Sequence, residues 1–485
     1  NGVTKNRIAR FNVDGSVDNT FNCSADAEVV CIAVQPDGRI VLGGLFTTIN
    51  STTRNGLARV NADGSLDSSI THNADSFVYA LALQPDGKIL VGGGFNDIGG
   101  VARNCIARLN ANGSLDTGFT VTASNTVDTI AVQPDNRILI GGIFDTVGGV
   151  ARAKCARLMA DGSVDTSFTA NADNWVQAIA VRPDGSILLG GTFSTINGVT
   201  RNAGAKVSST GVLDTAFNPN FSSWVYSIGI QANGSSIWAG WFANAQGVSR
   251  GGLARFASDG VMESFPNTWM TGVIRSCVLQ ANGNMMLGGS FTDAGGFPRT
   301  GLVRVLNNVT GSQSLQIEAQ RVTWSRTGST PEISQPVFEL SINGGASWSA
   351  LGTPARVASG WQLNGLSLPG SGTIRARGVA DGGNFNGCES VIEQSATFSL
   401  VPDIAVRQGA SPLDALLVDA QSTPLNFGST PAGTPVSKTL LIENTGTGNL
   451  TLSTPTRSGT NSSDFTITGP TAGTLAPGGT ATITI

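Results

Sequence analysis

Residues 84–95 read QPDGKILVGGGF, and residues 107–119 read ARLNANGSLDTGF. The first stretch opens with a Pro-Asp-Gly turn and continues as an apolar run that ends in glycines. The second stretch places an Asn-Gly turn between two short alternating runs. Short β-type runs separated by Gly and Asp turns about every 8–12 residues are typical of all-β folds. This part of the chain therefore predicts β-strands joined by tight hairpins.

The same pattern recurs with a period of 49 residues. The phenylalanine that follows the Gly-rich run occurs six times, at Phe46, Phe95, Phe144, Phe193, Phe242 and Phe291. A basic residue before the second turn occurs seven times, at Arg10, Arg59, Arg108, Arg157, Lys206, Arg255 and Arg304. Four short strands in about 40–50 residues, repeated in tandem, are typical of a β-propeller. Seven basic positions predict seven blades, the inner strands of the first lying upstream or being supplied otherwise. Six blades are the alternative, if N-terminal strands close the ring.

These motifs resemble the delta-60 repeat family, a bacterial group of β-propellers, and the resemblance covers residues 1–307. The pattern changes at residues 209–217, STGVLDTAF, and at residues 231–242, QANGSSIWAGWF. The family provides no catalytic residues to transfer to this sequence.

Two further segments lack the 49-residue period. Residues 308–400 keep strand-like alternation and resemble an immunoglobulin or fibronectin-III-like sandwich, within which SINGGASW (341–348) resembles an Asp-box hairpin with Asn343 in place of the Asp. Residues 401–485 resemble the choice-of-anchor D group of immunoglobulin-like domains, akin to the Hydin type, and end before its last strands are expected. The expected fold is all-β: a propeller and two sandwiches, cut at both ends from a longer modular protein.

Charge and hydropathy narrow the classes of partner. Only 13% of the residues are charged and the net charge is −4, which argues against a nucleic-acid binder because phosphate neutralisation requires a basic surface. No run approaches the roughly 18 apolar residues of a membrane span. Low charge and tandem sandwiches resemble bacterial secreted or cell-surface proteins. We therefore expect an extracellular or cell-surface location, with surface proteins, polysaccharide or a second copy of the chain as partners.

The sequence offers little material for catalysis or metal binding. Its one histidine, His72, is expected in a solvated loop. The six cysteines form no CxxC motif, so buried free thiols are expected, with Cys23–Cys31 as the most plausible disulfide. The spacing N-x-D-G-S-x-D in the turns suggests calcium as an alternative, but the third acidic ligand and the closing Glu are lacking. We expect no catalytic residues, no metal site and no cofactor.

The repeated charges of the second hairpin predict ion pairs. Arg59 and Asp67 are equidistant from Asp63 at the hairpin centre, so they are expected to face each other across the two strands. The repeats agree, since Lys206 is matched by Asp214 and Arg255 by Glu263. As exposed pairs they would each contribute about 0.2–1 kcal/mol.

Candidate ligand residues lie where the loops vary. The loops between second and third strands and between blades are longer than the Asp-Gly turns, and we call the end of the propeller that carries them the variable-loop face. One column there is basic: Lys5, Arg54, Arg103, Arg152, Arg201, Arg250 and Arg299. The other column begins the innermost strands: Glu28, Phe77, Thr126, Trp175, Trp224 and Val273.

Each column has a structural and a functional interpretation. Structurally, the basic side chains would pin loops to Asp26, Asp75 and Asp173, and the aromatic rings would pack between blades. Functionally, Phe77, Trp175 and Trp224 with the six arginines would surround the channel mouth and bind anionic or sugar ligands, acidic polysaccharide being favoured.

The leading functional prediction is a non-catalytic extracellular scaffold or adhesion module. The alternatives are a carbohydrate-binding propeller that recognises acidic glycans and, second, a glycan-acting enzyme.

Overall fold

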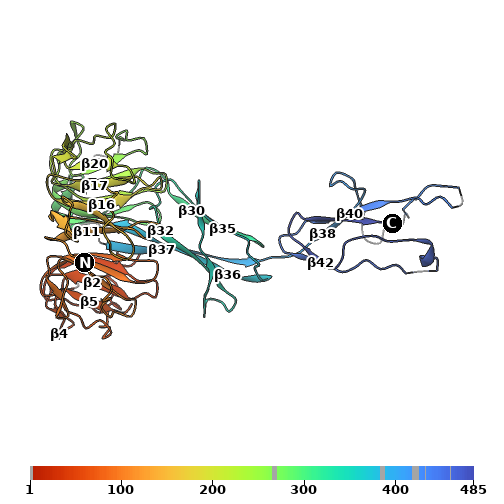
Figure 1. Ribbon diagram of the computed structural model, residues 1–485, viewed down its shortest axis with the longest axis horizontal. Helices are drawn as coiled ribbons and strands as arrows, with labels where there is room; N and C mark the ends of the chain where they lie inside the picture. The colour runs from red at the N-terminus through yellow and green to blue at the C-terminus, as the bar shows by residue number, and fades with distance from the viewer. Residues whose placement is uncertain (1–3, 265–269, 383–387, 418–424, 432, 459) are drawn as a thin grey trace. The chain divides into compact units, whose positions relative to one another are not determined.

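The computed structural model describes residues 4–264, 270–382, 388–417, 425–431, 433–458 and 460–485 (Figure 1). The chain divides into two compact units. The first contains Asn1–Gln313 with the segments Arg326–Pro336 and Arg377–Ile392. The second contains Ser314–Ser325, Val337–Ala376 and Glu393–Ile485. Nearly all regular structure in both units is β-strand.

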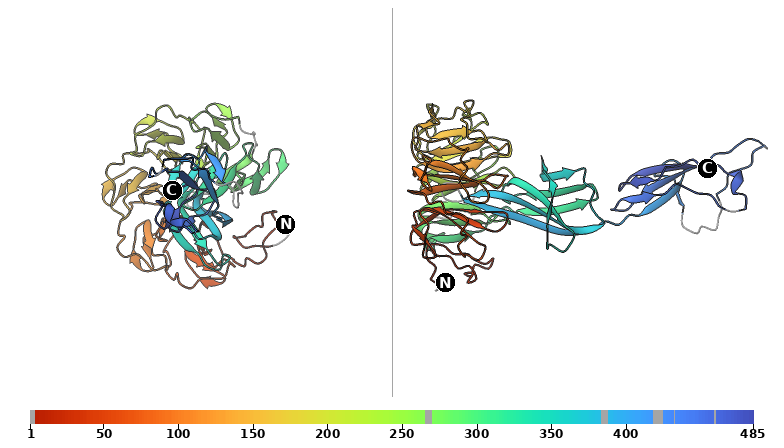
Figure 2. Two further views of the ribbon diagram at one scale, coloured as in Figure 1. Left: turned by 90° about the vertical axis from the view of Figure 1, so that its right-hand side faces the viewer. Right: turned by 60° about the horizontal axis from the view of Figure 1, so that its bottom comes forward.

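The first unit is a β-propeller, in which the repeats follow one another around a ring (Figure 2, left). The described residues contribute six full blades, numbered 1 to 6 along the chain. Their inner strands are β1 (Val29–Val34), β6 (Val78–Leu83), β11 (Val127–Val132), β16 (Val176–Val181), β21 (Val225–Ile230) and β26 (Met270–Leu279). The second strands are β2 (Ile40–Gly44), β7 (Ile89–Gly93), β12 (Ile138–Gly142), β17 (Ile187–Gly191), β22 (Ser236–Gly240) and β27 (Met285–Ala294). The third strands are β5 (Leu57–Val60), β10 (Ile106–Leu109), β15 (Cys155–Leu158), β20 (Gly204–Val207), β25 (Leu253–Phe256) and β29 (Leu302–Val305).

The loop between the second and third strands contains its own small hairpin. These hairpins are β3 (Thr48–Ile49) with β4 (Thr52–Thr53), β8 (Asp97–Ile98) with β9 (Val101–Ala102), β13 (Thr146–Val147) with β14 (Val150–Ala151), β18 (Thr195–Ile196) with β19 (Val199–Thr200), and β23 (Asn244–Ala245) with β24 (Val248–Ser249). In blade 6, β28 (Phe297–Pro298) pairs with the end of β27 instead.

The predicted fourth strand is reduced to a short hairpin arm. It makes one bridge to the third strand in each of blades 1 to 5, for example Val60 with Leu66. Further hydrogen bonds hold the arm, since the N–H of Asn61 donates to Ser65 and that of Asp67 donates to Arg59. The arm is short because the tight Asp-Gly turn is followed at once by the next blade-to-blade loop.

The hydrophobic core lies between neighbouring blades. One cluster joins Ala80, Leu90 and Ile106 of blade 2 to Val127 and Ile140 of blade 3, all 0% exposed. The apolar positions of the strands therefore face adjacent blades on both sides, which explains their near-continuous burial.

The predicted ion pairs form in all six repeats that carry the acidic partner. The basic nitrogen and the carboxylate are 2.6–2.8 Å apart in Arg10–Asp18, Arg59–Asp67, Arg108–Asp116, Arg157–Asp165, Lys206–Asp214 and Arg255–Glu263. The prediction that these pairs are exposed is wrong for most of them: the Arg59 side chain is 0% exposed, and that of Asp67 is 11% exposed. The arginines of blades 1, 2, 3 and 5 are buried, and each also reaches the next blade. Arg59 donates to the carbonyl of Ala111 at 3.0 Å, and Arg108 to that of Ala160 at 2.6 Å.

Blade 4 makes this connection with a different residue. Its third strand carries Lys206, which contacts Asp214 at 2.6 Å. Its first turn reads RPDG where other blades read QPDG, QPDN or QANG, and Arg182 donates to the carbonyls of Gly234 and Ser258, both at 2.9 Å. In blade 1 the equivalent residue, Gln35, accepts a bond from Arg59. Arg182 thus replaces the interblade bond that the third-strand arginine makes elsewhere.

The same contact closes the ring. The N-terminal hairpin, bridged between Phe11 and Val17, carries Val13 one 49-residue period before Ala62. Arg304 of blade 6 donates to the carbonyl of Val13 at 3.1 Å, and Arg10 donates to that of Ala62 at 2.5 Å. Seven third-strand hairpins therefore follow one another around the ring, six in the blades described above and one in the N-terminal segment.

Segments from further along the chain pack against the turn ends of the inner strands. Strand β37 (Cys388–Ser399) pairs in parallel with β1 through Ala33 and Glu389. Gln335 donates to the carbonyl of Leu83 at 2.7 Å, and Arg377 donates to that of Pro36 at 2.7 Å. The N–H of Glu332 donates to Ile230 at 2.7 Å. All these partners lie at or beside a first-to-second-strand turn.

The second unit contains the remaining sandwich elements. Its strands include β33 (Ser349–Gly352), β34 (Ala355–Val357) and β35 (Gly360–Asn364). Four further strands have residues in both units: β30 (Ser312–Glu318), β31 (Arg321–Thr327), β32 (Ser334–Ser341) and β36 (Ser371–Gly382). Asn343 accepts the N–H of Ser347 at 3.0 Å, so it organises the hairpin as an Asp would.

The C-terminal sheet has the order β39 (Ala415–Leu417), β38 (Ile404–Gln408), β40 (Thr439–Asn444) and β43 (Thr480–Thr484). Strands β41 (Leu450–Leu452) and β42 (Gly473–Leu475) pair beside the 3₁₀ turn Ser462–Asp464. The domain boundaries at residues 307 and 400 stay predictions.

Two sequence predictions about single residues need correction. Cys23 is a free buried thiol, as are Cys105, Cys155 and Cys277, so the predicted Cys23–Cys31 disulfide is wrong. Both side chains lie in the apolar cores, Cys23 beside blade 1 and Cys31 between blades 1 and 2. The side chain of Cys388 lies outside the described residues. His72 is half-buried and accepts the N–H of Leu115 at 3.3 Å, so it bridges repeats and is not a solvated loop residue.

Candidate functional site

The two ends of the propeller differ in what their residues contact. The first-to-second and third-to-fourth turns lie together, since Arg39 is 3.3 Å from Asp67 and Lys88 is 3.2 Å from Asp116. Gln335 and Arg377, from later in the chain, contact this turn end. The variable-loop face lies at the opposite end of the strands.

One repeated position in the blade-to-blade loops holds the hairpin loops of the variable-loop face in place. We call this position the capping column: Asp26, Asp75, Ser124, Asp173 and Ser222. Asp26 accepts the N–H groups of Thr47 and Thr48, both at 2.9 Å. Asp75 and Asp173 make equivalent bonds, and Ser124 and Ser222 replace the carboxylate in their repeats. The Thr47 hydroxyl and these amides lower the pKa of Asp26 to about 2. The carboxylate thus serves to fix a loop.

The predicted basic column is bound to backbone. Each guanidinium from Arg54 to Arg299 donates to the carbonyl of its own preceding residue. Arg103 also reaches Thr117 at 3.3 Å, and Arg201 reaches Thr215 at 2.9 Å. Arg103 and Arg201 are only 7% and 6% exposed. Lys5 donates to the carbonyl of Phe21 at 2.9 Å. The column pins loops as predicted, but to carbonyls and not to Asp26, Asp75 and Asp173.

Two aromatic residues of the second column are exposed, and the third is hydrogen-bonded to a buried carboxylate. Phe77 is 45% exposed and Trp224 is 41% exposed, so the interpretation of these rings as interblade core is wrong. They are exposed because each precedes its inner strand and leaves the interblade contact to the following valine, Val78 or Val225. Trp175 is half-buried, and its Nε1 donates to Asp128 Oδ2 at 2.5 Å. The arginines are therefore bound to backbone carbonyls, whereas two of the three aromatic rings are exposed and the third is bound to Asp128.

Asp128 is a buried carboxyl group on inner strand β11. It is 1% exposed, and its Oδ1 has no hydrogen-bond partner among the described residues. Burial raises the pKa of Asp128 to about 7, although the bond from Trp175 lowers it. The bulge between Val127 and Thr129 turns this side chain out of the regular alternation.

A cleft of about 560 Å³ lies between blades 4 and 5 on the variable-loop face. Its polar walls come from hydroxyl and amide side chains, those of Thr192, Ser194, Asn202, Asn220, Ser222, Ser223 and Asn244. Trp224 forms part of the wall, with Phe193 and Phe221 beneath. Asn202 Nδ2 donates to Asn220 Oδ1 at 2.8 Å, which aligns the two amides.

Sequence reasoning missed the aromatic partner of Trp224. Trp241 is 52% exposed, and its ring centroid lies 5.5 Å from that of Trp224 in a T-shaped contact. Tyr226 packs against the other side of Trp224 at 6.2 Å, with Arg275 5.6 Å from the Tyr226 ring centroid. The signal was present in the sequence, since AGWF replaces the GG-x-F of other repeats.

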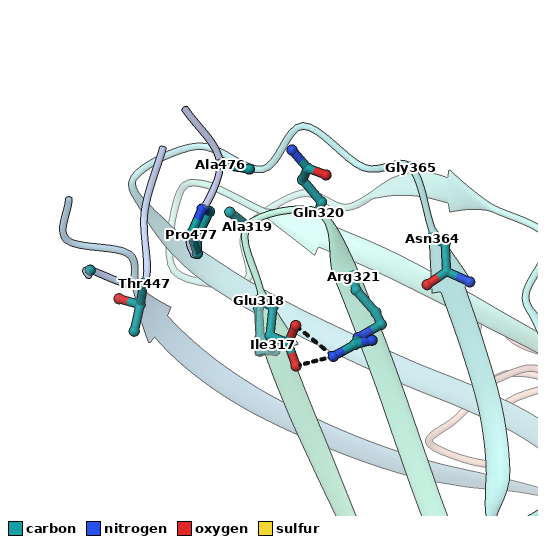
Figure 3. Close-up of a pocket in the computed structure, with 11 residues that line it drawn as sticks. Ile317, Glu318, Ala319, Gln320, Arg321, Asn364, Gly365, Thr447, Ala476 and Pro477 are labelled. Carbon is teal, nitrogen blue, oxygen red and sulfur yellow. Dashed lines mark hydrogen bonds and ion pairs between the residues drawn. The ribbon is translucent and has the colours of Figure 1, made fainter. Parts of the chain in front are cut away.

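A second cleft, of about 390 Å³, lies in the second unit (Figure 3). It is lined by Ile317–Arg321, Asn364, Gly365 and residues of the last domain, including Thr447 and Pro477. Its charged side chains neutralise each other, because Arg321 donates to both carboxylate oxygens of Glu318 at 2.7 and 2.8 Å. This cleft therefore presents little specific chemistry.

The residues that the structure describes contain neither a metal-binding cluster nor a membrane-spanning helix. No group of three or more His, Cys, Asp or Glu residues among them is placed to hold a metal ion. Among these same residues, no helix is long and apolar enough to cross a bilayer. Burial raises the pKa of the thiols of Cys23 and Cys105 to about 11, and of Cys155 and Cys277 to about 12.

The fold and repeat geometry define a β-propeller protein with immunoglobulin-like domains. The family described as a domain of unknown function (DUF5122) beta-propeller matches residues 1–21, 35–69, 84–119, 133–168, 182–217, 231–264 and 280–308. The HYDIN/CFA65/VesB-like Ig-like domain matches residues 417–485. Residues 1–308 thus belong to the DUF5122 β-propeller repeats, and residues 417–485 to the Ig-like family. These matches confirm the resemblances of residues 1–307 and 401–485, whereas that of residues 308–400 stays a prediction.

Similarity to other proteins is distant. No curated protein matches the chain in sequence. Among solved structures, the WD40 β-propeller domain of Doa1 is 13% identical with a TM-score of 0.35, the match covering 59% of this chain and 94% of that one. PorZ, a bacterial surface component of the type-IX secretion system of Porphyromonas gingivalis, is 13% identical with a TM-score of 0.37, the match covering 76% of this chain and 51% of that one. With TM-scores below 0.5, these structures are only weakly similar to this chain.

Proposed function

We propose that this chain is a non-catalytic adhesion and scaffold module of an extracellular or cell-surface protein, whose propeller binds glycan through its variable-loop face. The observation that carries the proposal is the exposure of Trp224 and Trp241, 41% and 52%, on a rigid repeat scaffold. Large aromatic rings that the fold does not bury are typical of binding surfaces.

The state of the ionisable groups supports a non-catalytic role. General acid–base catalysis favours an accessible group whose pKa lies near the working pH. The pKa of Asp128 lies near 7, but this residue is 1% exposed. Hydrogen bonds depress the pKa of the loop carboxylate of Asp26, and burial raises the pKa of the Cys155 thiol to about 12. These groups are suited to structural roles.

The test measures both the binding and the cleavage of the same polysaccharides. The whole chain is applied to an array of neutral, sulfated and uronate-containing polysaccharides, and the chain length of each bound glycan is measured afterwards. We expect retention of at least one polysaccharide with its length unchanged. Depolymerisation that a single substitution abolishes would make the protein an enzyme. Retention of none would overturn the glycan-binding role.

A further inference from the structure

We infer that the cleft between blades 4 and 5 is a site for a neutral saccharide. This inference rests on the proposed function and deepens it by naming the site and the ligand class.

The cleft is open because the side chain at position 203 is short. Position 203 belongs to a repeat column with positive φ in which only Lys154 is long, the other members being Gly56, Cys105, Ala203, Gly252 and Gly301. One blade earlier, Lys154 extends along the corresponding surface, and its ammonium reaches the Ile143 carbonyl at 3.3 Å and Asp145 at 2.6 Å. In the cleft, Ala203 has no side chain to span that distance, and Ser194 stands in the place of Asp145.

The lining combines a hydrogen-bonding wall with an aromatic ring. The bond between Asn202 Nδ2 and Asn220 Oδ1 leaves the Oδ1 of Asn202 and the Nδ2 of Asn220 outside that bond, one acceptor and one donor. Sugar hydroxyls both donate and accept, so they match such a pair. Trp224 supplies an apolar face for the C–H side of a sugar ring, and the T-shaped contact with Trp241 fixes its orientation. A volume of about 560 Å³ lies within the usual range for small-ligand sites, about 300–1,000 Å³.

The charges around the cleft favour a neutral ligand over an anionic one. The residues that line it carry no charged side chain. The adjacent Arg201 is 6% exposed and bound to the carbonyls of Thr200 and Thr215. Asp173 is hydrogen-bonded to the amide and hydroxyl of Ser194 at the rim. Burial raises the pKa of Asp173, but these bonds outweigh it and keep the pKa below its usual value, so the group is ionised at neutral pH. A carboxylate or sulfate on the ligand would meet this negative charge. Arg275 lies over Tyr226 and not in the lining.

The experiment compares substitutions inside the cleft with matched ones outside it. Binding of the whole chain to glucose-, mannose- and galactose-based hexasaccharides, and to sulfated and uronate-containing counterparts, is measured by calorimetry. Ala203→Lys copies the native Lys154 and fills the cleft, and Trp224→Ala removes the ring. Phe77→Ala changes the equivalent exposed position of blade 2, and Ala203→Gly keeps the cleft open.

We expect at least one neutral hexasaccharide to bind, and Ala203→Lys and Trp224→Ala each to weaken it about tenfold or more, which corresponds to about 1.4 kcal/mol. Phe77→Ala and Ala203→Gly are expected to change affinity less than about twofold. Thermal unfolding checks that each variant folds, and Trp224→Ala carries the test if Ala203→Lys does not.

Three results would overturn the inference. If glycan binding is unchanged in the folded cleft variants, this site is wrong while the proposed function stands. If sulfated or uronate-containing ligands bind better than their neutral counterparts, the ligand class is wrong. If no hexasaccharide and no polysaccharide binds, the inference and the glycan-binding role fail together.

Discussion

At the scale of single residues, the ion-pair column shows what a repeat reveals and what it conceals. Symmetry about Asp63 and the matched exchange to Lys206–Asp214 predict the pairing within a hairpin. The bond from Arg59 to the Ala111 carbonyl was not predictable, because it spans 52 residues and ends on backbone, which leaves no trace in the sequence. For the same reason the burial of the pairs was missed.

Blade 4 offers a direct test of this interblade bond. Arg182→Gln removes two bonds to the carbonyls of Gly234 and Ser258, and we expect a loss of about 1–3 kcal/mol in the free energy of unfolding. Adding Lys206→Arg restores the arrangement of the other blades and should recover most of the loss in denaturant titrations. Additive effects of the two changes would show that the residues do not substitute for each other.

Asp128 makes stability depend on pH. The unfolded carboxyl loses its proton near 3.8, whereas burial raises the folded pKa to about 7. The folded protein therefore binds more protons between these values, and stability falls as the pH rises through this window. Asp128→Asn keeps an acceptor for Trp175 and should raise stability at pH 8 by at most about 4 kcal/mol relative to wild type, with little effect at pH 4. An equal effect at both pH values would contradict the assignment.

At the scale of elements, the sequence predicted the strands and turns well because alternation and Asp-Gly turns are local signals. The two-residue loop hairpins, such as β3–β4, were missed because they are too short to show a period. The exposure of Trp224 was missed because an aromatic ring beside an apolar strand looks the same whether it packs inward or outward.

The loop-capping residue Asp26 makes the stability of the propeller depend on pH in acid. Asp26 has a pKa of about 2, mainly because the Thr47 hydroxyl donates to it, so it stabilises the folded state above its unfolded pKa and loses this effect as the pH falls from about 4 to 2. Asp26→Ser copies Ser124 and Ser222, which cap the same loop. We expect native-like thermal stability at pH 7 and a weaker decline between pH 4 and 2. A large loss at pH 7 would show that Ser cannot replace Asp here.

At the scale of the whole molecule, repeat counting predicted the propeller, and Arg304–Val13 shows how seven hairpins close the ring. The role of segments 326–336 and 377–392 was not predictable, since their contacts, such as Gln335 with Leu83, join residues 252 positions apart. A chain of residues 1–312 lacks these contacts and should unfold at a lower temperature than residues 1–400. Equal melting temperatures would show that the segments contribute no stability.

The central claim is that ligand binds at the variable-loop face between blades 4 and 5. Hydrogen–deuterium exchange of the whole chain, with and without the neutral hexasaccharide that binds best, tests it most directly. We predict that added protection is concentrated in peptides covering residues 192–203 and 220–247, which line the cleft and carry Trp241. Protection confined to the turn peptides 84–88 and 133–137, or to residues 401–485, would contradict the account.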